Sequence, residues 1–318
     1  MPSVSVIIPT YNLELLIERA LLSVIHQKGE HDIEIIIVDD CSTDETLTII
    51  KNLDCPFVKI LRQEHNQGPA AARNRGLAIA AGDFMAFLDG DDFWEPDFLN
   101  ETTKFLQTHP EAVAVSVMQH HKTFNGKDSI VPSQTSIHQP VLLDDFYDFW
   151  AKHTHVCTGS ALIRTAVAKA TGGQREDFRV CEDLEFWALI ATYGPWGFIP
   201  KVLFTSDGGL VTKKHGWIAK AKKRWASAVP TEIWSQRIVH RLPENMQGSF
   251  ARVQARIARG MAYSMLLDRR YETSRQEVLK YSALFPKNRI NSLFAFCSRS
   301  RCLWFFFATI LRTREHLR

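Results

Sequence analysis

The chain has 318 residues, of which 45% are hydrophobic and 23% are charged, with a formal net charge of +3. This composition is that of a globular protein able to bury a core, and it argues against disordered, low-complexity or repeat classes. Six cysteines without a CxxC pair argue against a disulfide scaffold or a structural zinc site. The first residues lack a basic segment, so we expect no signal peptide and a cytoplasmic location.

The charge is unevenly distributed along the chain. Residues 1–110 carry a net charge of −10, and the remainder carries +13. A basic C-terminal half indicates either an anionic partner, such as phosphate groups, an anionic membrane surface or nucleic acid, or a merely solvated basic surface.

Apolar runs and turn residues predict alternating strands and helices. In chain order we expect a strand at 4–9, a helix whose apolar face spans 13–24, a strand at 33–38, a helix from a Ser42/Glu45 capping box to 53, a strand at 58–61, a helix at 69–82, a strand at 84–88, a helix at 96–109 and a strand at 113–117. This alternation predicts an α/β, Rossmann-like fold with a mostly parallel sheet flanked by helices. From about Trp217 the pattern is mostly helical.

Acidic residues follow two of the predicted strands. Asp39 and Asp40 end one strand, and Asp89-Gly90-Asp91-Asp92 follows another. Ligands bind beyond the carboxyl ends of the strands in such sheets. Two carboxylates separated by one glycine can both approach Mg²⁺ or Mn²⁺, although acidic turns without such a role are common.

Five segments taken in order carry a family resemblance. They are VSVIIPTYN (4–12), IIIVDDCSTDET (35–46), NQGPAAARNRG (66–76), FLDGDDFWEP (87–96) and CEDLEFW (181–187). Together they resemble bacterial-type family 2 glycosyltransferases of the GT-A fold over about residues 3 to 215. The resemblance implies inverting, metal-dependent, non-processive transfer of a sugar from a nucleotide-diphosphate sugar, with a UDP-sugar as the expected donor.

The resemblance also implies a domain plan. Residues 1–215 would form the GT-A domain, with a nucleotide-sugar half at 1–118 and an acceptor half at 119–215. Residues 216–318 would form a helical C-terminal region, either associated with a membrane surface or packed on the core.

Donor-side roles follow from the same resemblance. Pro9, Thr10 and Tyr11 are expected to shape the nucleotide site. Asp39 is expected to accept a hydrogen bond from the uracil imide, although it could instead cap the following helix. The remaining donor-side residues, which lie beside Asp39 or near the sugar diphosphate, are Asp40, Ser42 and Arg73. The alternative for Arg73 is a surface arginine of its helix.

The metal and the catalytic base are assigned in the same way. Asp91 of the DXD motif would be the main ligand of a Mn²⁺ or Mg²⁺ ion, and Asp89 would contact the ribose or reach the metal through water. His215 lies where related enzymes carry a further metal ligand. Asp183 would be the base that takes the proton of the acceptor hydroxyl, with Glu182 as the second candidate, and one of this pair could instead cap the helix.

The acceptor would be a glycan or a lipid-linked sugar in cell-surface polysaccharide or glycolipid synthesis. A processive synthase is disfavoured, because Ala221 replaces the glutamine of the Q-x-x-R-W motif. A different class of function is a non-catalytic basic binding protein for nucleic acid or anionic lipid. Residues 213–224 form a basic run, but no nucleic-acid module accompanies it, so we expect no nucleic-acid partner.

The stretch from Cys302 to Leu311 is apolar and aromatic and lies between arginines. Ten residues are too few to cross a bilayer, which needs about 20. The stretch therefore either lies at a membrane interface, peripheral on the cytoplasmic face, or forms a helix docked on the core.

Overall fold

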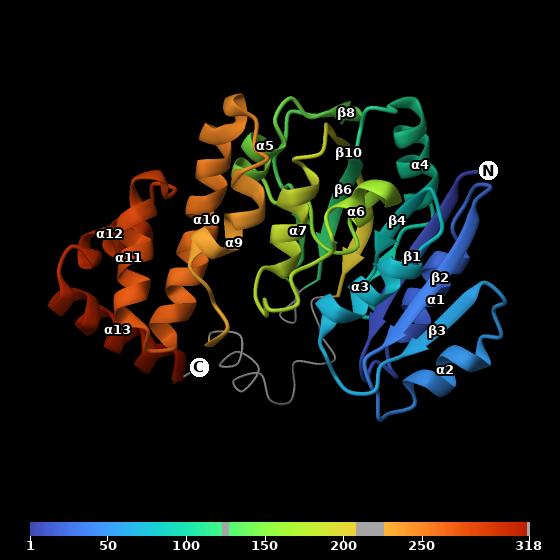
Figure 1. Cartoon of the computed structure of the whole chain (residues 1–318), viewed down its shortest axis with the longest axis horizontal. Coiled ribbons are helices and arrows are strands. Elements are labelled where there is room, and N and C mark those ends of the chain that lie inside the picture. Colours follow the sequence, from blue (N-terminus) through green and yellow to red (C-terminus); the bar gives the residue numbers. More distant parts are fainter. Residues whose placement is uncertain (123–126, 208–225, 317–318) are drawn as a thin grey trace. The chain divides into compact units, whose positions relative to one another are not determined.

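The computed structural model describes residues 1–122, 127–207 and 226–316. It divides into two compact units, one of Met1–Glu176 with Glu182–Lys213 and one of Asp177–Cys181 with Lys214–Arg318 (Figure 1). His215 and the neighbouring basic run lie outside the described residues, so the predicted role of this histidine stays a prediction. No helix in the described part of the chain is both long and apolar enough to cross a membrane.

The first unit is built on one mixed sheet, whose main path among the described residues runs β3-β2-β1-β4-β9-β6-β10-β5. Its strands are β1 (Ser3–Thr10), β2 (Asp32–Asp39), β3 (Val58–Arg62), β4 (Phe84–Phe87), β5 (Phe93–Trp94), β6 (Ala114–His121), β7 (Ser129–Val131), β8 (Val141–Leu142), β9 (Ala161–Arg164) and β10 (Trp196–Ser206). On this path β1 to β4, β6 and β10 run in one direction, whereas β9 and β5 run against them. The predicted α/β class with a mostly parallel sheet is confirmed.

Alternate residues of a strand point to opposite faces of the sheet. Helices pack on both faces. The helices of this unit are α1 (Ile17–Ile25), α2 (Thr46–Asn52), α3 (Pro69–Ile79), α4 (Phe98–Thr108), α5 (Phe146–Lys152), α6 (Thr165–Ala170) and α7 (Glu182–Ile190). Val4, Val6 and Ile8 of β1 share a core with Leu21 of α1. Ile7, on the opposite face, packs against α3.

A close approach sets the position of α3 on the sheet. A Cβ built on Gly76 would lie 2.4 Å from Cγ2 of Ile7, so a larger residue would push α3 away from β1. The helix begins directly after the Gly68-Pro69 turn, with proline in its first turn. The sequence thereby places the buried face of α3, which includes Arg73, tightly against the sheet.

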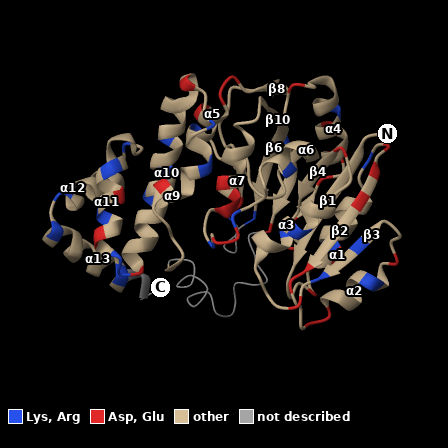
Figure 2. Ribbon diagram, viewed as in Figure 1, with Lys and Arg blue, Asp and Glu red and all other residues tan. Residues whose placement is uncertain are grey.

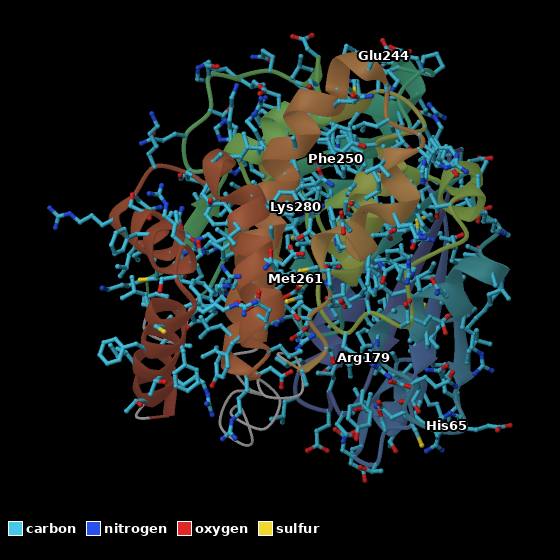
Figure 3. All side chains as sticks on the ribbon, turned by 60° about the vertical axis from the view of Figure 1, so that its left-hand side comes forward. His65, Arg179, Glu244, Phe250, Met261 and Lys280 are labelled. Carbon is cyan, nitrogen blue, oxygen red and sulfur yellow. The ribbon has the colours of Figure 1, made fainter. Side chains whose placement is uncertain are left out.

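The second unit is helical, as predicted. Its helices are α9 (Thr231–Val239), α10 (Gln247–Leu267), α11 (Tyr271–Tyr281), α12 (Arg289–Ser298) and α13 (Arg301–His316), with short 3₁₀ turns at Glu244–Met246 and Ser282–Leu284. Small residues of α10, such as Ala258 and Ala262, share its core with Phe294 and Trp304. Phe250 and Met261, labelled in Figure 3, are also buried along α10.

Two local predictions differ from the structure. The helix expected from a Ser42/Glu45 capping box begins at Thr46, and its first turn receives no capping bond from Glu45. The Ser42 hydroxyl instead accepts a hydrogen bond from the Asn12 amide at 3.0 Å, which ties the ends of β1 and β2 together. Strand β10 was not predicted. It contains Pro200, and its register against β6 shifts between Ile199 and Val202.

Candidate active site

The carboxylate of Asp39 lies buried at the carboxyl end of β2. Its oxygens accept hydrogen bonds from the Ser42 amide at 3.3 and 3.2 Å, and its Oδ2 lies 3.3 Å from Nε of Arg62. The next helix begins at Thr46, so Asp39 does not cap it, which removes that alternative. Asp39 stands beside the end of β1 in register with Thr10.

Asp40 has a full set of protein partners. Its Oδ1 accepts hydrogen bonds from Nε2 of Gln63 at 2.6 Å and from the Gln67 amide at 2.7 Å. Its Oδ2 accepts one from the Gly68 amide at 2.8 Å. Three donors from the loop before α3 therefore hold this carboxylate, and Asp40 positions that loop and the start of α3.

The end of β1 presents one exposed aromatic ring. Pro9 and Thr10 are buried, whereas Tyr11 is 47% exposed. Acidic segments follow β2 at this end of the sheet (Figure 2). Tyr11 is thus free to stack on a planar ligand next to the buried Asp39 and Ser42.

Arg73 is a buried residue of α3 rather than a surface arginine. Its Nη2 donates to Oδ1 of Asp89 at 2.7 Å and its Nη1 donates to Oε1 of Gln174 at 3.2 Å. Burial, the largest single effect, lowers the pKa of Arg73, but the carboxylates of Asp89, Asp183 and Glu182 together raise it above its ordinary value. This arginine therefore lies in the field of both acidic motifs predicted from the sequence.

The residues after β4 form an acidic turn. Burial, with Asp89 next in importance, raises the pKa of Asp91 to about 6. Burial, together with Asp89 and Asp91, raises the pKa of Asp92 to about 8. These carboxyl groups lack enough positive charge nearby to stay ionised at low cost, which is the electrostatic condition that a bound cation relieves.

The glycine between the two acids of the D-x-D motif packs closely against apolar side chains. A Cβ on Gly90 would lie 2.7 Å from Cδ1 of Leu13 and 3.1 Å from Cδ1 of Ile17. The turn therefore packs directly against Leu13 and Ile17, with Asp89 and Asp91 on either side of Gly90.

Sequence reasoning missed two residues of this cluster. Nη1 of Arg19 lies 2.5 Å from Oδ2 of Asp207, and Nη2 of Arg19 donates to the Asp91 carbonyl oxygen at 2.6 Å. The Asp207 amide donates to Oδ1 of Asp92 at 2.9 Å. Asp207 directly follows β10. Had that strand been predicted, Asp207 would have been a candidate site residue for the same reason as Asp39, because ligands bind beyond the carboxyl ends of parallel strands.

Asp183 and Glu182 form the first turn of α7. Burial raises the pKa of Asp183, Arg73 opposes the shift and Asp89 adds to it. Burial also raises the pKa of the partly buried Cys157 thiol, and the charges of Asp92, Asp183 and Asp89 contribute. The acids of both motifs therefore act on the same two neighbours, Arg73 and Cys157. A carboxyl group with a raised pKa, such as Asp183, is suited to take up a proton.

Three tryptophans, in α5, α7 and β10, belong to the core. Trp150, Trp187 and Trp196 are each at most 3% exposed, and Nε1 of Trp196 donates to the Ser116 hydroxyl at 3.1 Å. Their rings are not available to a sugar, because side chains of the same unit cover them.

A preformed metal site is not present among the described residues, where no group of three or more His, Cys, Asp or Glu side chains is placed to hold an ion. Mg²⁺ usually binds one or two carboxylates together with substrate phosphates. The Asp89/Asp91 pair fits that arrangement. One oxygen of the buried Asp207 side chain also has no hydrogen-bond partner in the described part of the chain.

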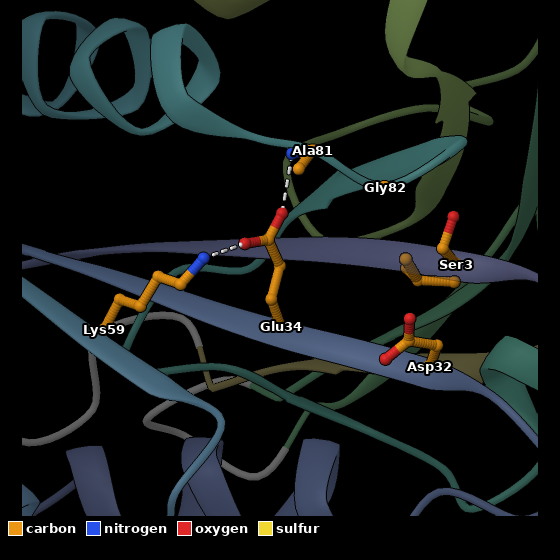
Figure 4. Close-up of a pocket in the computed structure, with 7 residues that line it drawn as sticks. Ser3, Asp32, Glu34, Lys59, Ala81 and Gly82 are labelled. Atoms are coloured by element: carbon orange, nitrogen blue, oxygen red, sulfur yellow. Dashed lines mark hydrogen bonds and ion pairs between the residues drawn. The ribbon is translucent and has the colours of Figure 1, made fainter.

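A cavity of about 250 Å³ lies at the opposite, amino ends of the strands (Figure 4). Glu34 in its wall accepts from the Ser5 hydroxyl at 2.5 Å and the Ala81 amide at 2.6 Å, and it pairs with Nζ of Lys59 at 2.7 Å. The protein itself satisfies this carboxylate, so we assign no ligand to the cavity.

Solved structures share the fold. The Staphylococcus aureus TarS 1–349 structure in complex with UDP-GlcNAc matches with a TM-score of 0.67 and 18% identity, covering 98% of this chain and 92% of that one. A mannosyltransferase from Pyrobaculum calidifontis in complex with GDP-Man and Mn²⁺ matches with a TM-score of 0.60 and 18% identity, covering 99% and 88%. The fold is therefore of the GT-A class, as predicted.

The family follows from the sequence comparisons. The model of glycosyl transferase family 2 matches residues 5–171, and the chain belongs to this family. The Bacillus subtilis (strain 168) glycosyltransferase TuaG, named for teichuronic acid biosynthesis, is 34% identical over 199 residues, which cover 61% of this chain and 73% of TuaG.

A shorter match reaches higher identity. An uncharacterized glycosyltransferase of Haemophilus influenzae (strain ATCC 51907 / DSM 11121 / KW20 / Rd) is 45% identical over 112 residues, 34% of this chain. The matched residues span 44% of that relative's length.

Proposed function

We propose that this transferase moves a sugar from a nucleotide-diphosphate sugar, a UDP-sugar, to a hydroxyl of a glycan or lipid-linked acceptor in cell-surface polysaccharide or glycolipid synthesis. The observation that carries the proposal is Arg73, which pairs with Asp89 and lies in the field of Asp183. The TarS structure in complex with UDP-GlcNAc supports a UDP-sugar as the donor. The similarity to TuaG, which is named for teichuronic acid biosynthesis, supports a role in cell-surface polysaccharide synthesis.

In this proposal residues 1–118 bind the donor and residues 119–215 bind the acceptor. Tyr11 stacks on the base, Asp39 accepts a hydrogen bond from it, and Pro9, Thr10 and Ser42 shape the surrounding surface. Asp40 acts through the loop it holds rather than by direct contact, because its oxygens already accept three hydrogen bonds.

Asp91 and Asp89 would hold a Mn²⁺ or Mg²⁺ ion, with His215 as a further ligand. The ion would neutralise the charge on the departing diphosphate. Raised carboxyl pKa values at Asp91 and Asp92 support this assignment, because the acidic turn lacks compensating charge. The mannosyltransferase that matches this fold is in complex with Mn²⁺.

The chemistry proposed for the chain's own residues is a single displacement. Arg73 orients the diphosphate oxygens and stabilises their charge as the bond to the sugar breaks. Asp183, or Glu182 as the second candidate, accepts the proton of the acceptor hydroxyl as that oxygen attacks from the opposite face. One displacement inverts the anomeric carbon, so an α-linked donor would yield a β-linked product.

Donor turnover tests the metal assignment. UDP-sugars are incubated with the full chain and Mn²⁺, and UDP release is measured for Asp91→Ala and for Asp97→Ala as the matched control. Asp97 pairs with Lys28 at 3.1 Å on the surface. We expect Asp91→Ala to lose at least about 100-fold in turnover, with Asp97→Ala unchanged. Equal turnover in both variants would remove Asp91 as a ligand.

Inversion has its own test. With any acceptor that turns over, the anomeric proton of the product is followed by NMR from an α-linked donor. A β-linked product is expected, and an α-linked product would rule out a single displacement.

We also propose that the enzyme acts in the cytoplasm, peripheral on the cytoplasmic face of the membrane. The basic C-terminal half supports this location, because anionic headgroups attract such segments.

A further inference from the structure

Large apolar side chains are concentrated on the surface of the last three helices. Of the seventeen such residues that are exposed in the described part of the chain, nine lie between residues 279 and 310. They are Leu279, Leu284, Ile290, Leu293, Phe296, Leu303, Phe305, Phe306 and Ile310. A concentration of this kind marks an interaction surface, whereas single exposed apolar residues are ordinary.

The exposed residues of α13 form a stripe beside its packed face. Leu303, Phe306 and Ile310 are spaced by three and four residues, so they lie along one side of the helix. Trp304 and Ala308 are buried in the core of the unit. Cys302–Leu311 therefore docks on the core of its unit with one face and leaves another face uncovered.

Helix α12 repeats the arrangement. Phe294 and Cys297 are buried, and the ring of Phe294 packs against Trp304 of α13 with 5.5 Å between ring centroids. Ile290, Leu293 and Phe296 remain exposed on another side, where Phe296 is 58% exposed. We call the three exposed residues of α12 and the three of α13 (Leu303, Phe306 and Ile310) the apolar stripes.

The segment that carries the apolar stripes is strongly basic. Residues 278–314 contain seven Lys and Arg and no Asp or Glu. Figure 2 marks basic residues along α12 and α13. Lys287, Arg289 and Arg299 are exposed and form no ion pair within the described ranges. Unpaired positive charge thus flanks uncovered aromatic and aliphatic side chains.

We propose that α12 and α13 bind the surface of an anionic lipid bilayer through the apolar stripes. Phenylalanine and leucine side chains enter the boundary between headgroups and acyl chains, and Lys287, Arg289 and Arg299 reach the lipid phosphates. A second copy of this chain is the weaker occupant, because like positive charges would meet across the contact. One face of each helix packs in the core, so the helices lie along the surface.

This inference deepens the proposed location and does not depend on the catalytic assignment. An enzyme bound to the membrane would encounter lipid-linked sugars by diffusion in the plane of the bilayer. Membrane binding would therefore favour the lipid-linked acceptors proposed above. The two claims can fail separately, since vesicle binding is measured without donor and donor turnover is measured without vesicles.

The apolar part is tested by co-sedimentation of the full chain with vesicles of phosphatidylcholine alone or of phosphatidylcholine mixed with the anionic lipid phosphatidylglycerol. Phe296→Ser/Phe306→Ser is compared with Val239→Ser, which changes an exposed apolar residue of α9 in the same unit. We expect the double variant to lower the partition coefficient at least about tenfold and Val239→Ser to leave it unchanged.

The charge part uses Arg289→Gln/Arg299→Gln. We expect about fivefold weaker binding for each charge removed, a loss of binding to the mixed vesicles at high salt, and little binding to phosphatidylcholine. These surface changes should leave the thermal unfolding midpoint and UDP release unchanged.

Three results would overturn the proposal. They are undiminished binding by both double variants, equal binding to neutral and anionic vesicles, and a dimer in light scattering that Phe296→Ser/Phe306→Ser dissolves. The last result would assign the apolar stripes to a second copy.

Discussion

The guanidinium of Arg73 on α3 lies 2.7 Å from the carboxylate of Asp89, which follows β4, and the same side chain reaches Gln174, a hundred residues further along the chain. One buried arginine thus joins the acidic turn to the loop after α6. Because burial removes competing water, this pair holds Asp89 in a defined orientation.

The first prediction concerns the shape of this arginine. Arg73→Lys keeps the charge but presents a single ammonium group, which cannot donate to both Asp89 and Gln174 with the geometry of a guanidinium. We expect kcat for UDP release to fall about 10- to 100-fold. Arg75→Lys, on the same helix but facing the Arg62 carbonyl, is the control and should stay near the parent rate.

The second prediction separates the two candidate bases. Asp183→Asn should lower kcat for transfer by about 10²- to 10⁴-fold, while donor binding, followed by protection against thermal unfolding, is retained. Glu182→Gln should have a clearly smaller effect. A larger loss for Glu182→Gln would reverse the assignment.

The third prediction is a pH dependence of stability without added metal. The pKa of Asp91 is raised to about 6 and that of Asp92 to about 8, from 3.8. The folded chain therefore holds protons that the unfolded chain has lost, and unfolding releases them. Stability should fall as pH rises from about 4 to about 8, on the order of several kcal/mol, because one pKa unit corresponds to about 1.4 kcal/mol.

The measurement is the thermal unfolding midpoint in EDTA at several pH values. Asp92→Asn should flatten the slope, because the group with the larger shift no longer titrates. Added Mn²⁺ should stabilise the chain more at pH 8 than at pH 5, since protons compete for the same oxygens. A midpoint that rises over this interval would contradict the electrostatics of the acidic turn.

The fourth prediction tests how α3 is placed. Alanine normally favours a helix over glycine by about 1 kcal/mol, but Gly76→Ala would bring a methyl group to 2.4 Å from Cγ2 of Ile7. We expect a net destabilisation of about 1–3 kcal/mol and lower donor turnover, because α3 carries Arg73.

A double-mutant cycle supplies the control. Ile7→Ala removes the clashing methyl group, so Ile7→Ala/Gly76→Ala should be less destabilised than the sum of the single changes. Additive effects would mean that the contact between β1 and α3 does not determine the position of the helix.

Much of the fold was predictable because its signals are local. Apolar runs identified β1, β2 and β4, and acidic residues directly after β2 and β4 indicated where a ligand would bind. These signals need no knowledge of distant neighbours, since strand direction alone places the carboxyl ends of parallel strands along one edge. The family resemblance added the expected roles of Arg73 and Asp183, which stay predictions and which no periodicity could supply.

The tertiary structure decided which polar groups meet and which surfaces remain uncovered. The pairs between Arg19 and Asp207 and between Arg73 and Gln174 join residues 188 and 101 positions apart, and such contacts follow from strand order rather than from local pattern. Packing likewise showed that Trp187 belongs to the core and that Phe306 does not. Amino-acid type sets how favourable burial is, but only the arrangement of neighbouring helices and strands determines whether a side chain is covered.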